Sequence, residues 1–137
     1  AKGFMLHDFK EMSPELTVAG IDISEYAIES SIDTVKQYLE VGNAKSLPFP
    51  DDSFDLVISI NTVHNLTEKD CRKALREIER VSRGHSFITV DAWRTEKERE
   101  QMLKWNLTAL TYMHVAQWEK LFREVGYTGD YYWFIAC

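Results

Sequence analysis

The spacing of one glycine and one acidic residue most constrains what this chain can fold into. Gly3 leads directly into an apolar helical stretch, and Asp22 follows nineteen residues later, at the end of the short apolar run 17–21. A glycine turn at a helix start, with an acidic residue about 20 residues on at a strand end, is typical of the second half of a nucleotide-binding βαβ unit. The glycine lets a ligand approach the backbone, and the carboxylate can accept both hydroxyl hydrogens of a ribose. The first half, a strand with its leading glycines, is expected before Ala1.

Segments of strand period and helix period alternate along the chain, which indicates a parallel sheet covered on both faces. We therefore predict one α/β domain over residues 1–137, incomplete at its N-terminus, with a doubly wound, mostly parallel sheet, helices on both faces and its first strand missing. The expected helices are 4–12, 24–35, 67–83, 95–107 and 115–125, and the expected strands are 16–21, 37–41, 54–60, 86–90 and 131–136. The run 54–60 is nearly all apolar and β-branched, so we expect it to be buried on both faces.

Polar residues follow the predicted strands. In sheets of this kind, ligands bind beyond the carboxyl ends of the strands. We therefore expect these residues to border a binding cleft: Asp22, Asn43 and Ala44, Asn61 to His64, and Asp91.

Charge and composition narrow the range of partners. The 137 residues carry a formal net charge of −6, which argues against a nucleic-acid partner, because such partners favour clustered Lys and Arg. No apolar run approaches the roughly 18 residues that span a bilayer, so no membrane partner is expected. Cys71 and Cys137 form neither a disulfide framework nor a zinc site, and a cytoplasmic location is the expectation. No cluster has metal-ligand spacing, so we expect no metal site.

Four stretches, in order and at the right spacing, resemble the motifs of class I S-adenosylmethionine-dependent methyltransferases, which have a Rossmann-like fold. The match runs from Ala1 to about Asp91, with Ala1 to Phe4 similar to the tail of the glycine-rich first motif. The Leu-Pro-Phe loop at 47–49, followed by an Asp-containing strand, is not part of the usual dehydrogenase pattern. The four stretches, which resemble the acidic second strand, the adenine loop, the fourth strand and the helix end before the fifth strand, are 18–24, 42–49, 54–59 and 77–83.

The resemblance implies S-adenosylmethionine as the cofactor and a role for each matching position. Asp22 would hold the ribose hydroxyls, and Ile23 would pack on one face of the adenine. Asn43 would meet the adenine amino group, and the backbone N–H of Ala44 would meet a ring nitrogen. The residues expected to approach the methionine part are Lys2, Gly3 and, bordering the acceptor as well, Asn61.

The chain departs from the family pattern in two places. The family usually has Asp where this chain has Asn43, whose side-chain carbonyl still accepts a hydrogen bond. The first strand, which lies centrally in the family's sheet, is absent from the sequence. The gap has three solutions: the flanking strands close it, another chain fills it in a homo-oligomer, or further residues precede Ala1.

Each candidate residue also has an ordinary structural explanation. Asp22 could serve only the dipole of the following helix, and Asn43 could be a turn residue. His64 follows the strongest strand and is a candidate general base, although a hydrogen-bonded loop histidine explains it equally well. Asp91 could face the cleft or cap the next segment. The aromatic residues are expected mostly in the core: Trp105, Tyr112, Trp118, Tyr131, Tyr132 and Trp133.

The function predicted from the sequence is S-adenosylmethionine-dependent methyl transfer to a small-molecule acceptor. Such a displacement needs alignment of acceptor, methyl and sulfur more than acid–base chemistry, which explains why binding residues are more visible than catalytic ones. A catalytically inactive fragment or interaction module of the same fold is the first alternative. An NAD(P)-dependent oxidoreductase is the second.

Overall fold

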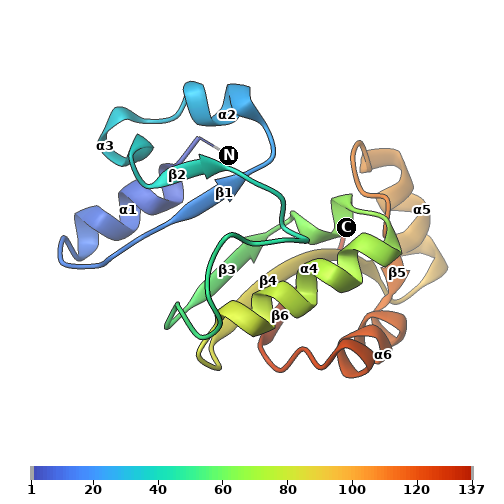
Figure 1. Ribbon diagram of the computed structural model, residues 1–137. Coiled ribbons are helices and arrows are strands. Elements are labelled where there is room, and N and C mark those ends of the chain that lie inside the picture. Colours follow the sequence, from blue (N-terminus) through green and yellow to red (C-terminus); the bar gives the residue numbers. More distant parts are fainter. Residues whose placement is uncertain (1, 137) are drawn as a thin grey trace. The chain divides into compact units, whose positions relative to one another are not determined.

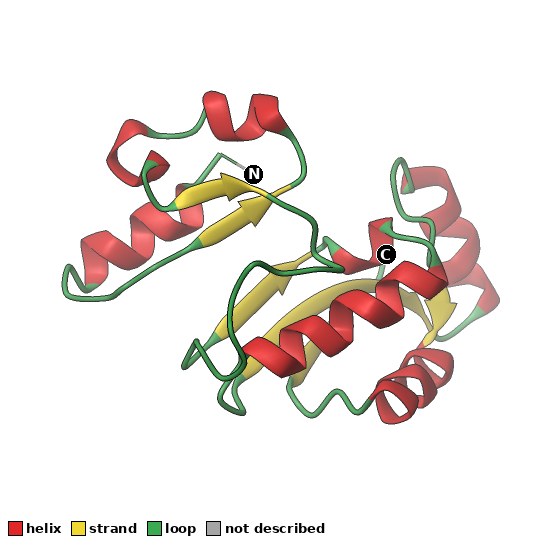
Figure 2. Cartoon of the chain, in the orientation of Figure 1, coloured by secondary structure: helices red, strands yellow, loops and turns green. Residues whose placement is uncertain are grey.

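The computed structural model describes residues 2–136 of the chain, which divide into two compact units, Ala1–Pro48 and Phe49–Cys137. Both units consist of parallel strands connected through helices (Figures 1 and 2). The predicted α/β class with parallel sheets is therefore confirmed. The strands form two sheets, one in each unit, and the single domain over 1–137 stays a prediction.

The first unit is built around a short parallel pair of strands. Strand β1 (Gly20–Asp22) pairs with β2 (Leu39–Val41) in the register Gly20↔Leu39 and Asp22↔Val41. The helices of this unit, shown in blue in Figure 1, are α1 (Phe4–Met12), α2 (Glu25–Glu29) and α3 (Asp33–Lys36). Because α2 and α3 connect two parallel strands, this part of the chain is a βαβ crossover. The unit predicted from Gly3 and Asp22 is a different one, of which the chain supplies α1 and β1.

The helix predicted over 24–35 is interrupted between α2 and α3. The hydroxyls of Ser30 and Ser31 donate to the carbonyls of Tyr26 and Ile28, at 2.5 and 2.6 Å. Such serine-to-backbone bonds compete with the helical ladder. The next amide, of Ile32, donates to Lys2 O at 3.1 Å rather than into the helix. The prediction of helical structure in 24–35 was therefore correct, but the prediction of a single continuous helix was wrong.

The second unit is a four-stranded sheet centred on β4 (Ser86–Trp93). All three partners run parallel to it: β3 (Val57–Ile60), β5 (Met113–His114) and β6 (Asp130–Phe134). The connecting segments are the 3₁₀ turn η1 (Val63–Asn65), α4 (Glu68–Val81), α5 (Glu96–Trp105) and α6 (Val115–Val125). In Figure 1, α4 crosses in front of this sheet.

The core of the second unit is formed by α4, α6 and β4. Cys71 and Leu75 of α4 are buried, and Trp118 of α6, which was expected in the core, is fully buried. Along β4, fully buried residues alternate with half-buried ones, so Thr89, Asp91 and Trp93 share the less buried face. Among residues 2–136, no helix is long and apolar enough to cross a membrane.

Several element boundaries differ from the prediction. Strand β3 starts at Val57 rather than Phe54, and it is half-buried rather than buried on both faces, because within the described residues it pairs with β4 alone. Strand β4 continues to Trp93, and β5 was not predicted. Trp105 and Tyr132 were expected in the core, but they are 73% and 62% exposed.

Candidate functional site

Asp22 lies at the carboxyl end of the parallel pair in the first unit. Its Oδ1 accepts the backbone N–H of Ser24 at 2.9 Å, and Ser24 in turn caps α2 by accepting the N–H of Ala27 at 3.2 Å. The carbonyl of Asp22 accepts the N–H of Gly42 at 2.9 Å, which joins it to the end of β2. The half-buried carboxylate is thus held in place where a ligand of a parallel sheet binds.

Ile23, Asn43 and Ala44 surround the same strand ends. Ile23, the residue that follows Asp22, presents an apolar side chain that is 68% exposed. Asn43 is a turn residue here: its Oδ1 accepts the N–H of Lys45 at 3.1 Å, and its carbonyl accepts the N–H of Ser46 at 3.0 Å. Because an amide oxygen has two lone pairs, the same Oδ1 can accept a second hydrogen. Ala44 is half-buried next to it.

Lys2 and Gly3 lie where the chain enters α1. Gly3 has a left-handed backbone, with φ +82°, and an added Cβ would lie 2.8 Å from Val35 Cγ2. Lys2 places its Nζ 5.4 Å from the centre of the Tyr26 ring. Both requirements at position 3, the positive φ and the close approach, explain why a glycine stands there.

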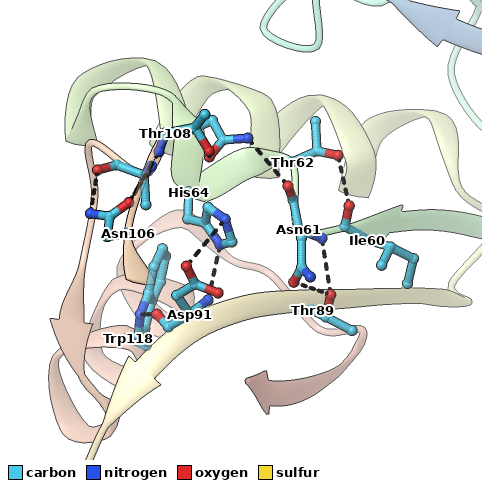
Figure 3. A network of polar contacts seen from close by, with 11 residues as sticks. Ile60, Asn61, Thr62, His64, Thr89, Asp91, Asn106, Thr108 and Trp118 are labelled. Carbon is cyan, nitrogen blue, oxygen red and sulfur yellow. Dashed lines mark hydrogen bonds and ion pairs between the residues drawn. The ribbon is translucent and has the colours of Figure 1, made fainter. Parts of the chain in front are cut away.

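In the second unit, Asn61 follows the end of β3 with a left-handed backbone, at φ +48°. Thr89 of β4 fixes this conformation from the neighbouring strand (Figure 3). The N–H of Asn61 donates to Thr89 O at 3.1 Å and to Thr89 Oγ1 at 2.9 Å, and that hydroxyl donates to Asn61 Oδ1 at 2.8 Å. Asparagine tolerates this backbone better than most residues, so Asn61 holds an exposed bend at the strand end.

His64 lies in η1 and is almost completely buried. Its Nδ1 accepts the backbone N–H of Asp91 at 2.9 Å, so the neutral ring carries its proton on Nε2, which lies 3.7 Å from Asp91 Oδ2. Burial lowers the pKa of His64, and the Asp91 carboxylate opposes this effect. Burial raises the pKa of Asp91, against the effect of His64. The lone pair that a general base would use is already occupied by an amide, and the base role of His64 stays a prediction.

The loop 106–111, to which the sequence assigned no role, is hydrogen-bonded to η1 and the residue after it. The carbonyl of His64 accepts the N–H groups of Leu110 and Thr111, at 3.0 and 2.9 Å. The hydroxyls of Thr108 and Thr111 donate to Asn65 Oδ1 and Leu66 O, at 2.9 and 2.7 Å. The run Asn106-Leu-Thr has turn-forming residues that could have indicated a loop, but nothing in it predicts what the loop contacts.

The structure thus brings the predicted site residues together in two groups, one in each unit. The first group holds Lys2, Gly3, Asp22, Ile23, Asn43 and Ala44, and the second holds Asn61 and His64 together with Thr89 and Asp91. The assigned roles of these residues in binding remain predictions. Within residues 2–136, no group of three His, Cys, Asp or Glu side chains could hold a metal ion.

Comparison with known proteins places this chain in a family. The profile of a methyltransferase domain matches residues 1–90. Over 109 residues, 78% of the chain, the sequence is 33% identical to tRNA (carboxymethyluridine(34)-5-O)-methyltransferase of Arabidopsis thaliana. It is 39% identical over 74 residues, 53% of the chain, to methyltransferase YcgJ of Bacillus subtilis. The chain spans 26% and 28% of the lengths of these relatives.

Solved structures agree on the fold. The crystal structure of YcgJ superposes with a TM-score of 0.66 at 21% identity, covering 90% of this chain and 58% of that one. PigF with SAH superposes with a TM-score of 0.67 at 16% identity, covering 99% and 45%. The oxidoreductase alternative is therefore set aside, and S-adenosylmethionine is the cofactor of the class. This chain belongs to the methyltransferase-domain family, with the Rossmann-like fold of the class I S-adenosylmethionine-dependent enzymes.

Proposed function

We propose that the chain transfers a methyl group from S-adenosylmethionine to a small-molecule acceptor. The observation that carries the proposal is the half-buried Asp22 carboxylate, held by the Ser24 amide at the carboxyl end of β1 and followed in the chain by the exposed Ile23. A carboxylate that accepts hydroxyl hydrogens, next to an apolar surface for a base, is what an adenosine group requires. The family match over residues 1–90 supports the same cofactor.

In this proposal, each residue contacts a different part of the cofactor. Asp22 accepts the ribose hydroxyls, and Ile23 packs on the adenine, whose edge meets Asn43 and Ala44. Lys2 and Gly3 contact the methionine part, and the role of Asn61 stays what the family resemblance implies. Bound S-adenosylmethionine supplies a methyl group on a positively charged sulfur. The contribution of the protein is to orient the reactants and exclude water.

The acceptor class is the finer part of the proposal. The net charge of −6 favours a small molecule over a nucleic acid. One relative is named for a tRNA, and others are named as ajmaline N-methyltransferase and demethylmenaquinone methyltransferase. The test measures transfer of tritiated methyl groups from S-adenosylmethionine to total tRNA and, separately, to a small-molecule extract of the cells that supplied the tRNA. Label in the tRNA alone would contradict a small-molecule acceptor.

Calorimetric titration with S-adenosylhomocysteine tests the cofactor assignment. Replacing Asp22 by Ala removes charge-assisted hydrogen bonds and is expected to weaken binding by about 1–3 kcal/mol. Asp8→Ala removes an exposed carboxylate from α1 of the same unit and serves as the matched control. Equal affinity in wild type and Asp22→Ala would remove Asp22 from the site. Binding of NADH without binding of S-adenosylhomocysteine would contradict the proposal as a whole.

Absence of any ligand binding would favour the inactive interaction module instead. Sedimentation of the whole chain at several concentrations tests the predicted self-association, for which a mass of 16.0 kDa is the monomer value. A cytoplasmic location remains part of the proposal, because the described cysteine, Cys71, is a free thiol in the core. Burial raises the pKa of Cys71 to about 12, so this thiol is inert.

A further inference from the structure

Asp91 lies near the carboxyl end of β4, and Tyr112 lies directly before β5, the strand that pairs with that end. Strands β4 and β5 are parallel, with Ala92 opposite Met113 and Trp93 opposite His114. The Trp93 and His114 rings meet edge to face at 4.9 Å, which shows that paired residues share a face. Continued back by one residue, beyond the start of β5, the same register brings Tyr112 opposite Asp91. Burial raises the pKa of Tyr112 to about 12, and the charge of Asp91 adds to this effect.

This face has buried hydrogen-bonding groups without partners. Within residues 2–136, the hydroxyl of Tyr112 and the indole N–H of Trp93 are buried and make no hydrogen bond. The indole N–H of Trp118, in contrast, donates to Asp91 O at 3.0 Å (Figure 3). Buried polar groups of native proteins are almost always satisfied. Two unsatisfied donors on the face of β4 that carries Asp91 therefore indicate a place for a further polar group.

Asp91, rather than His64, is the group that a ligand can use. The Asp91 side chain is 15% exposed, and that of His64 is 4% exposed. The Nδ1 of His64 is taken by the Asp91 amide, and its carbonyl by Leu110 and Thr111. The carboxylate, by comparison, has several acceptor positions on two oxygens. His64 thus fixes the backbone on which the carboxylate stands.

We propose that Asp91 and Tyr112 bind a hydroxyl group of the methyl acceptor, with His64 as a positioning residue. A hydroxyl donates its hydrogen to the Asp91 carboxylate and accepts the hydrogen of Tyr112. An ammonium group would satisfy Asp91 but has no lone pair for Tyr112. On transfer, the bond from oxygen to the methyl carbon forms, the carbon–sulfur bond breaks, and sulfur keeps the electron pair. The hydroxyl proton passes to Asp91. This inference rests on the proposed methyl transfer.

The test is a nitrogen-15 NMR titration of the whole chain with phenol, and with anisole as the matched probe that lacks the hydroxyl hydrogen. The indole N–H signal of Trp93, assigned with Trp93→Phe, is the reporter, and the indole N–H of the exposed Trp105, assigned with Trp105→Phe, is the internal control. Phenol is expected to shift the Trp93 signal saturably, and anisole to bind at least fivefold more weakly. Equal shifts with both probes, or no shift with phenol, would overturn the proposal.

Variants separate the roles of the three residues. Asp91→Ala is expected to bring phenol down to the affinity of anisole, and Tyr112→Phe to weaken phenol at least threefold. Asp55→Ala, which removes an exposed carboxylate of the same unit, is the control. If Asp91→Ala loses the Trp118 signal of the folded chain, Asp91→Asn takes its place. Unchanged phenol affinity in the folded Asp91 variant contradicts the assignment.

The positioning role of His64 predicts rescue by a conservative variant. Asn keeps an acceptor atom close to the position of Nδ1, and Ala does not. His64→Asn should therefore retain phenol binding within about threefold, whereas His64→Ala should lose it while the Trp118 signal remains. Equal binding in both variants would contradict the positioning role.

Calorimetry with S-adenosylhomocysteine distinguishes the two proposals, because it reports on Asp22 in the first unit. Asp91→Ala is expected to leave that affinity unchanged. Cofactor binding without a phenol response defeats this inference alone. A phenol response without cofactor binding defeats the proposed function and leaves Asp91 and Tyr112 as a hydroxyl site without a methyl donor.

Discussion

The two units of the molecule differ in how many of their apolar side chains are fully buried. Among the described residues of Ala1–Pro48, Val35 is the one apolar side chain that is fully buried. The unit Phe49–Cys137 has fully buried residues on α4, β4 and α6, among them Leu75, Ile88 and Trp118. Both units have the same parallel strand geometry. Regular secondary structure alone therefore does not make a core.

Stability and cofactor binding are expected to depend on different units. Most residues proposed to hold the cofactor lie in the first unit, where few side chains are buried. Since burial of apolar area is the dominant stabilising contribution, we expect the second unit to be the more stable part of the chain. Regions that bind ligands are commonly those of lower local stability. A ligand that binds only the folded form should stabilise the first unit.

The largest expected effect comes from core truncation. Leu75→Ala in α4 should lower the free energy of unfolding of the second unit by about 2–5 kcal/mol. Leu39→Ala, at a half-buried position of β2, should cost about 1 kcal/mol. Tryptophan fluorescence in urea measures the first change, because all four tryptophans lie in the second unit. Hydrogen exchange of the β1 and β2 amides measures the second. Equal losses would remove the distinction between the units.

Glycine replacement compares the units at matched backbone geometry. Gly3 and Gly84 both have positive φ values, +82° and +96°, so Ala at either site should cost about 1–2 kcal/mol. Gly3→Ala has the further contact with Val35 at 2.8 Å, whereas the Cβ of Gly84→Ala meets open space. We therefore expect the larger loss at Gly3, seen as faster amide exchange in α1. A larger loss at Gly84 would contradict this.

Helix caps should behave alike in both units, because capping is a local interaction. Ser24 accepts the N–H of Ala27 at 3.2 Å in the first unit, and Thr95 accepts the N–H of Glu98 at 3.3 Å in the second. Replacing either by Ala should cost about 1 kcal/mol. Amide exchange at Ala27 and Glu98 measures both. A loss at Ser24 several times larger than at Thr95 would show that the cap of α2 also maintains the site around Asp22.

The smallest expected effect is a pH dependence confined to the second unit. The folded chain holds His64 neutral below its usual pKa of 6.5, whereas the unfolded chain takes up the proton there. Stability should therefore fall as the pH drops through about 6.5. Burial raises the pKa of Asp91 above its usual value of 3.8, so the folded chain binds this proton more tightly than the unfolded chain. The stability gained in this way is lost as the pH rises, which is the opposite sense, and the loss begins near pH 3.8, below the range of His64. Urea midpoints between pH 5.5 and 8 should slope in wild type and flatten in His64→Asn. A slope retained in that variant would assign the effect elsewhere.

Local sequence signals predicted most of the fold. The helices expected over 67–83, 95–107 and 115–125 were correct as α4, α5 and α6, because a helix depends on residues within one or two turns of each other. The failures were non-local. Whether the run 54–60 is covered on two faces depends on its partner strands, which its own residues do not encode.

The candidate sites show the same limit. The position of Asp22 at a strand end followed from the short apolar run 17–21 before it. The hydrogen bonding of His64 could not be predicted from its neighbours, because its Nδ1 accepts the N–H of an amide 27 residues away. The same holds for Tyr112, whose proximity to Asp91 depends on the register of a two-residue strand, β5, that carries no sequence signal.

Amide hydrogen exchange of the whole chain, with and without S-adenosylhomocysteine, measures stability and ligand binding in both units at once. In the free chain, the amides of Gly20–Asp22 and Leu39–Val41 should exchange faster than those of Ser86–Trp93. The ligand should slow exchange in the first two segments, and Asp22→Ala should abolish this protection. Protection that appears in Ser86–Trp93 alone, or that persists in Asp22→Ala, would show that Asp22 does not hold the ligand in the first unit.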